Sequence, residues 1–108
     1  MNPSRRSALA LLGATALLPF HGRAQAPAPQ VSVYKDPNCG CCGAWVEHMR
    51  RNGFRVTAYD VTDLDAVKRK HRVPAALGSC HTATVAGYTI EGHVQADAVH
   101  RLLAQRPA

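Results

Sequence analysis

The chain has 108 residues, a formal net charge of +6 and a hydrophobic fraction of 46%. Once residues 1–26 are set aside as a leader, ten lysines and arginines face seven acidic residues, which leaves a net charge of +3. This length allows one small domain and not two, and so low a charge excludes a typical nucleic-acid-binding protein. The one basic run, at residues 68–72, is typical of a solvated helix face.

Residues 1–26 have the features of an export signal. Arg5-Arg6 is followed by an apolar stretch at residues 8–20 and by Ala24-Gln25-Ala26, a small-residue cleavage signal. The apolar stretch is well short of the roughly 20 residues that span a bilayer, so we expect cleavage after Ala26 and no stable membrane anchor. The paired arginines favour twin-arginine export. We therefore expect a periplasmic protein, in a compartment where thiols persist only if paired, bound to metal or recycled.

The next residues predict a short tether and the first half of an α/β domain. Residues 27–30 alternate Pro and Ala as an extended tether, and residues 31–106 form the domain. Residues 31–34 alternate as a strand that ends at the turn Asp36-Pro37-Asn38. Trp45 and Met49 recur at helical spacing, which predicts a helix of about ten residues from Cys42 to the stop at Asn52-Gly53. Residues 55–61 follow as a second strand.

The second half of the domain predicts another helix, a hairpin and a final helix. Thr62-Asp63-Leu64-Asp65 resembles a capping box with Thr62 as its first residue, and the helix that it opens ends before Val73-Pro74. Residues 82–85 and 88–90 form two β-branched runs around Ala86-Gly87, which predicts a hairpin. Residues 96–105 form an amphipathic helix. The predicted order is β-α-β-α-β-β-α in a single domain.

Three of the four cysteines crowd into the segment Cys39-Gly40-Cys41-Cys42. The neighbours Cys41 and Cys42 cannot easily form an ordinary disulfide with each other, so at least one thiol remains for other chemistry. Thiolates select soft ions such as Cu(I) and zinc. Four thiolates, with Cys80 as the fourth, would repel one another unless cations neutralise them, and several bridging Cu(I) ions do so better than one Zn(II). The cysteines therefore favour a multinuclear copper site.

The histidines are candidates for completing this site. His81 follows Cys80 directly and is the best supporting ligand, since imidazole also suits copper. His93 is either a ligand, a hydrogen-bonding partner of a ligand, or a loop histidine that caps the last helix. Met49 falls on the apolar stripe of its helix and is expected in the core. The remaining histidines of the domain are assigned to the surface: His48, His71 and His100.

The order of elements, with a C-x-x-C motif between the first strand and the first helix, resembles the thioredoxin fold. The domain also resembles a narrower family, the small periplasmic copper-resistance proteins of the CopG type. The motifs that carry this resemblance are Val33-Tyr34-Lys35, Cys39-Gly40-Cys41-Cys42-Gly43, Trp45-Val46-Glu47-His48, Val73-Pro74, Ser79-Cys80-His81-Thr82-Ala83, Gly87-Tyr88 and Ile90-Glu91-Gly92-His93-Val94. The family implies a thioredoxin-like domain that binds copper through its cysteines.

Two functions of different class follow. The first is a periplasmic protein that holds more than one Cu(I) for copper resistance or homeostasis, with or without redox cycling of copper, in contact with a copper chaperone or an efflux component. The second is a thiol-disulfide oxidoreductase in which Cys39 attacks and Cys42 resolves, with Pro74 as the candidate cis-proline. Two weaker alternatives are a structural zinc site and a stabilising disulfide from Cys39 or Cys42 to Cys80.

Overall fold

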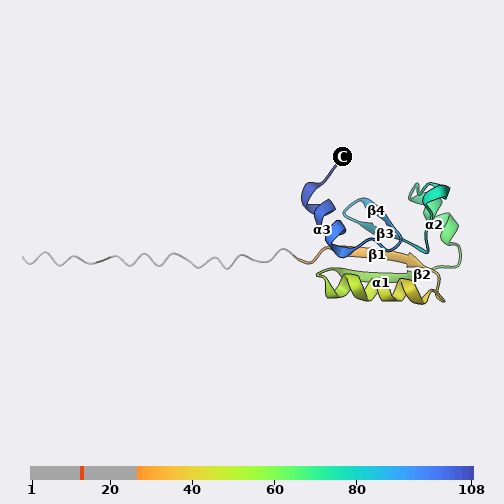
Figure 1. Cartoon of the computed structure of the whole chain (residues 1–108), viewed down its shortest axis with the longest axis horizontal. Coiled ribbons are helices and arrows are strands. Elements are labelled where there is room, and N and C mark those ends of the chain that lie inside the picture. The colour runs from red at the N-terminus through yellow and green to blue at the C-terminus, as the bar shows by residue number, and fades with distance from the viewer. Residues whose placement is uncertain (1–12, 14–26) are drawn as a thin grey trace, which may run out of the picture.

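The architecture is a four-stranded mixed sheet between helices (Figure 1). The computed structural model describes Gly13 and residues 27–108, and the predicted leader lies outside this range. The elements are β1 (Gln30–Lys35), α1 (Gly40–Arg51), β2 (Arg55–Asp60), α2 (Leu64–Lys70), the 3₁₀ turn η1 (Ala75–Leu77), β3 (His81–Val85), β4 (Tyr88–Glu91) and α3 (Ala96–Gln105).

The strands lie in the order β2-β1-β3-β4. β1 pairs in parallel with β2 and antiparallel with β3, and β3 and β4 form the antiparallel hairpin expected around Ala86-Gly87. The β-α-β-α-β-β-α order and this mixed sheet confirm the predicted thioredoxin-like fold. None of the helices in residues 27–108 is both long enough and apolar enough to cross a membrane.

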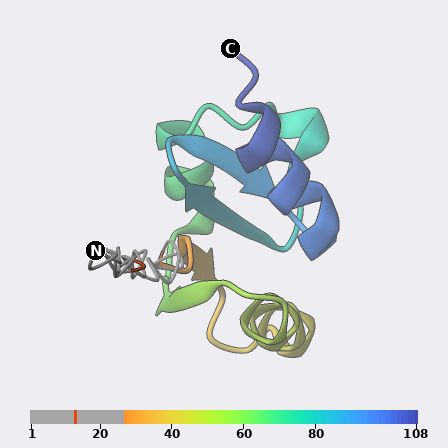
Figure 2. The ribbon, with the colours of Figure 1, turned by 90° about the vertical axis from the view of Figure 1, so that its left-hand side faces the viewer.

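The core lies on one face of the sheet. β1 turns Val31 and Val33 to this face, where helices α1 and α3 cover them. Because side chains alternate along a strand, Ser32 and Tyr34 of β1 point to the opposite face, on which α2 lies. Figure 2 shows α2 and α3 on opposite sides of the β3–β4 hairpin. The buried core residues are Val31, Val33, Trp45, Val46, Met49, Phe54, Ala83, Val85, Ile90, Ala96 and Val99.

Three local predictions need correction. α1 begins at Gly40 rather than Cys42, with Cys39 as its N-cap, so Cys41 and Cys42 belong to its first turn. The N-cap of α2 is Asp63 and not Thr62, since Asp63 Oδ1 accepts a hydrogen bond from the backbone N–H of Ala66 at 3.0 Å. The described residues contain no cis peptide bond, so Pro74 is not the cis-proline of the oxidoreductase alternative.

Candidate metal centre

The turn between β1 and α1 delivers the cysteine motif to a helix N-terminus. Asp36 Oδ1 accepts from the backbone N–H of Asn38 at 2.8 Å, and the Asp36 carbonyl accepts from the N–H of Cys39 at 3.1 Å. This Asx turn reverses the chain and places Cys39 at the N-cap position of α1. The side chain of Cys39 does not cap the helix, so its sulfur stays available for other contacts.

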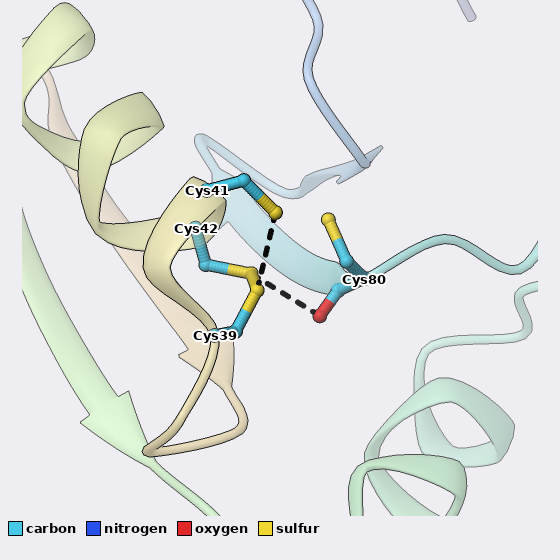
Figure 3. Close-up of side chains that lie close together, drawn as sticks. All are labelled: Cys39, Cys41, Cys42 and Cys80. Carbon is cyan, nitrogen blue, oxygen red and sulfur yellow. Dashed lines mark hydrogen bonds between the residues drawn. A yellow bond between two sulfur atoms is a disulfide. The ribbon is translucent and has the colours of Figure 1, made fainter.

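Sheet pairing brings the fourth cysteine to the same place. β1 and β3 are antiparallel, with Lys35 opposite His81, so the residue before β3 lies beside the end of β1. That residue is Cys80. Its carbonyl oxygen lies 3.4 Å from Cys42 Sγ, and Figure 3 shows Cys80 facing the three cysteines of the motif from the neighbouring loop.

The four sulfur atoms converge at the start of α1. All of them lie within 4.8 Å of one another. Cys39 and Cys42 form a disulfide with a Cα–Cα distance of 5.4 Å, whereas Cys41 and Cys80 are free thiols. The alternative of a disulfide to Cys80 is therefore wrong. The sulfur atoms of Cys41 and Cys39 lie 3.4 Å apart (Figure 3). Cys41 is exposed to solvent, whereas Cys42 is fully buried.

Two imidazoles extend this group of sulfurs. Cys80 Sγ lies 3.6 Å from His81 Nδ1 and 3.3 Å from His93 Nε2. One donor atom from each of these three residues lies within 4.8 Å of the other two. Cys80 thus belongs to both groups, the four thiols and the thiol with two imidazoles. We call the six residues together the Cys/His cluster: Cys39, Cys41, Cys42, Cys80, His81 and His93.

His81 is the buried member of the imidazole pair. Its side chain is fully inaccessible and its ring lies 4.4 Å from the ring of Trp45, centroid to centroid. Burial, with a smaller contribution from the nearby charge of His93, lowers the pKa of His81 from 6.5 to about 4, so the imidazole is neutral at physiological pH. Its Nε2 atom is buried without a hydrogen-bond partner among the described residues. A neutral imidazole is the form that binds metal, so the residue fits a ligand role.

The other histidines do not join the cluster, and two of them, His48 and His71, are half-buried rather than surface residues as predicted. His48 is half-buried, and its Nε2 accepts a hydrogen bond from the backbone N–H of Ala96 at 3.1 Å. His48 therefore caps α3, a role that had been one alternative for His93. His71 stacks on Tyr34 and His100 is exposed, while Met49 is fully buried in the core, as expected.

The basic run at residues 68–72 is not wholly a solvated face, because its first lysine turns inward. Lys68 Nζ donates to Glu91 Oε1 at 2.7 Å and to Thr82 Oγ1 at 3.0 Å. The side chains of Lys68 and Glu91 are only 12% and 14% exposed. This ion pair joins α2 to β3 and β4 immediately beside His81. The helical pattern alone gave no signal for it, since the partner is 23 residues away.

The fold and the cluster define a thioredoxin-like domain with a centre of thiols and imidazoles at the start of its first helix. A family model described as "Protein of unknown function, DUF411" matches residues 77–108. Two solved structures, both of copper resistance protein CopG, are each 43% identical to this chain, with TM-scores of 0.68 for form 2 and 0.67 for form 1. No curated protein matched.

These matches confirm the resemblance found in the sequence motifs. In sequence and in fold the chain is similar to the copper-resistance proteins of the CopG type. In both comparisons 69% of this chain aligns, and it spans 60% of the length of the CopG chain.

Proposed function

We propose that this protein is an exported copper-binding protein that holds more than one Cu(I) ion in the Cys/His cluster and so contributes to copper resistance. The observation that carries the proposal is the convergence of four sulfur atoms within 4.8 Å of one another. Thiolates and imidazoles are donors that suit copper, and the similar structures are those of copper resistance proteins.

Charge favours several ions over one. When the disulfide is reduced and metal displaces the protons, four thiolates share a space only a few ångströms across, and their mutual repulsion is large at such separations. The two imidazoles add donor atoms without adding negative charge, because histidine binds metal as a neutral imidazole. Several monovalent copper ions bridged by sulfur neutralise such a cluster, whereas one divalent zinc ion neutralises half of it. Zinc is therefore the alternative cargo.

The disulfide makes copper binding sensitive to redox conditions. In the oxidised chain the sulfurs of Cys39 and Cys42 are bonded to each other, so Cys41 and Cys80 are the thiols that can form metal–thiolate bonds. Two electrons from a thiol reductant cleave the disulfide and release two further thiolates. The reduced chain then offers its full set of ligands, and the oxidised chain a smaller one.

The proposal is tested by titrating the reduced chain, residues 27–108, with Cu(I) under anaerobic conditions against a chromophoric Cu(I) chelator. We expect more than one tightly held Cu(I) per chain, and fewer in Cys41→Ser. The variant His100→Gln is the control, because this exposed histidine lies outside the cluster. Uptake of a single zinc ion, with no excess of copper, would contradict the proposal.

A second candidate function is thiol-disulfide exchange, and the Cys39–Cys42 disulfide favours it. In this scheme the Cys39 thiolate of the reduced chain attacks a substrate disulfide, and Cys42 resolves the mixed disulfide. The two functions differ in their use of Cys41: Cys41→Ser leaves a disulfide reductase active, and Cys39→Ser abolishes it. The imidazoles around Cys80 have no part in this scheme, which is why we place it second.

We further propose that the protein acts in the periplasm after twin-arginine export and cleavage after Ala26, with a copper chaperone or an efflux component as its partner. The paired arginines and the short apolar stretch of residues 1–26 support the route. Sequencing the N-terminus of protein recovered from the periplasm tests export and cleavage. A start at Pro27 supports both, and an intact Met1 in the cytoplasm contradicts both.

A further inference from the structure

The motif Trp45-Val46-Glu47-His48 is part of the family resemblance but has no place in the ligand set. Two of its side chains reach the same short segment of chain, residues 92–96, which comprises the link from β4 to α3 and the first residue of α3. Trp45 Nε1 donates to the carbonyl oxygen of Val94 at 2.8 Å, and His48 Nε2 accepts from the N–H of Ala96 at 3.1 Å. We call residues 92–96 the His93 segment, because it carries the exposed imidazole of the Cys/His cluster.

The His93 segment is also tied to the loop that carries Cys80. The N–H of Gly92 donates to the carbonyl of His81 at 3.1 Å. Gly92 has a φ of +74°, and a Cβ built at this position would lie 2.6 Å from Ser79 Oγ. Only glycine allows so close an approach in this backbone conformation. One end of the segment therefore lies against Ser79, and the two contacts from α1 hold the rest.

Helix α1 connects the two kinds of ligand. Its first turn carries Cys41 and Cys42, and Trp45 and His48 follow at intervals of three residues, so they lie close to the same side of the helix. Trp45 is 5% exposed and packs against the ring of His81. A helix is stiff over this length, so a contact that fixes the His93 segment to Trp45 and His48 also fixes it relative to the cysteines.

We propose that Trp45 and His48 are positioning residues that hold the His93 imidazole at the cysteine cluster, as a ligand arranged before copper arrives. The copper part of this inference rests on the proposed function; the arrangement of His93 in the metal-free protein does not. Neither side chain touches the metal in this scheme. Losing one of them frees His93 to move away from Cys80, from which its Nε2 is 3.3 Å.

The test compares two substitutions of His48. Leu at this position cannot accept the hydrogen bond from Ala96, whereas the side-chain amide oxygen of Gln can. In the metal-free, reduced chain we expect His48→Leu to speed hydrogen exchange of the Ala96 amide by about fivefold to tenfold, the worth of one hydrogen bond. The NMR signals of the His93 ring should shift toward those of a free imidazole. His48→Gln should restore both, and the Trp45→Phe variant, which keeps the ring but loses the N–H, should behave like His48→Leu.

Copper binding supplies the decisive comparison. His48→Leu should weaken Cu(I) affinity about as much as His93→Gln does. The number of Cu(I) ions bound per chain should be the same in these two variants. In a chain that already carries His93→Gln, His48→Leu should cause no further loss, because it acts through His93. His71→Gln is the matched histidine control and should change neither quantity, because His71 stacks on Tyr34 on the opposite face of the sheet.

The possible results separate the inference from the proposed function. An equal loss of affinity from His48→Leu with and without His93 would overturn the positioning role, since it would show a general effect on stability. Unchanged His93 signals in the metal-free His48→Leu and Trp45→Phe variants would also overturn it. If the wild-type chain takes up no copper, the proposed function fails, and the metal-free NMR comparison still decides whether these two residues hold His93.

Discussion

The closeness of the His93 segment to Ser79 leads to a quantitative prediction. Replacing Gly92 by alanine introduces two costs. A left-handed backbone conformation costs a residue with a Cβ about 1–2 kcal/mol. The new methyl group would also lie 2.6 Å from Ser79 Oγ and 2.9 Å from Ser79 Cβ, and relieving such overpacking costs typically about 1–3 kcal/mol more. We expect Gly92→Ala to lower the free energy of unfolding by about 2–5 kcal/mol.

Gly87 provides a matched control. It has a φ of +83°, close to that of Gly92, but a Cβ at this position would meet no atom of the described residues within 4 Å. Gly87→Ala should therefore cost only the backbone part, about 1–2 kcal/mol. Urea unfolding of the metal-free chain, followed by circular dichroism, measures both variants, and the difference between them isolates the contact with Ser79.

A third variant tests the cause of that difference. Ser79→Gly removes both atoms that the new methyl group would meet, so it should recover the contact part of the loss in Gly92→Ala and none of the backbone part. The reasoning is refuted if Gly92→Ala costs no more than Gly87→Ala, or if Ser79→Gly recovers nothing. We expect Gly92→Ala also to weaken Cu(I) binding, since it pushes Cys80 and His93 apart.

Two further predictions concern the buried groups beside the cluster. The His81 imidazole binds a proton below about pH 6.5 in the unfolded chain but only below about pH 4 in the folded one, so stability is lost as the pH falls through this window. Between pH 7 and pH 4.5 we expect the free energy of unfolding of the metal-free chain, measured with urea, to fall by about 2 kcal/mol. The His81→Phe variant should lack this fall. An equal fall in the wild-type chain and in the variant would show that His81 is not responsible. Lys68→Met leaves the carboxylate of Glu91 without its cation and should cost about 3 kcal/mol, the lower end of the range for a buried ion pair. The neighbouring exposed Arg69→Met should cost less than about 0.5 kcal/mol, and similar costs at both positions would contradict a structural role for the ion pair.

The fold was predictable because its signals are local. Periodicity placed all four strands and three helices, and α3 has the predicted bounds, residues 96–105. Among the element bounds, the errors that matter for the site lie at helix starts: α1 begins two residues earlier than predicted, and α2 has a different N-cap. Asp63 and Thr62 are both good N-caps, and only the backbone conformation selects between them. The short 3₁₀ turn η1 was not predicted, since three residues give too little pattern.

The convergence of the four cysteines was predictable, because it follows from the order and pairing of the strands. Three cysteines are neighbours in the chain, and pairing β1 with β3 brings Cys80 to them. The roles of His48 and Lys68 were not predictable, because each depends on a contact with a residue far along the chain: Ala96 is 48 residues from His48, and Glu91 is 23 residues from Lys68. Helical periodicity shows which face of a helix is apolar, but it does not show which polar side chain on the border finds a partner.

The central claim is that the thiolates of this domain bridge several copper ions at one point. X-ray absorption at the copper edge tests it most directly, on the reduced chain loaded anaerobically with Cu(I). We predict a first shell dominated by sulfur, together with scattering from a second copper atom, which Cys41→Ser weakens. A single copper with sulfur and nitrogen neighbours, and no copper–copper scattering at full loading, would contradict the claim.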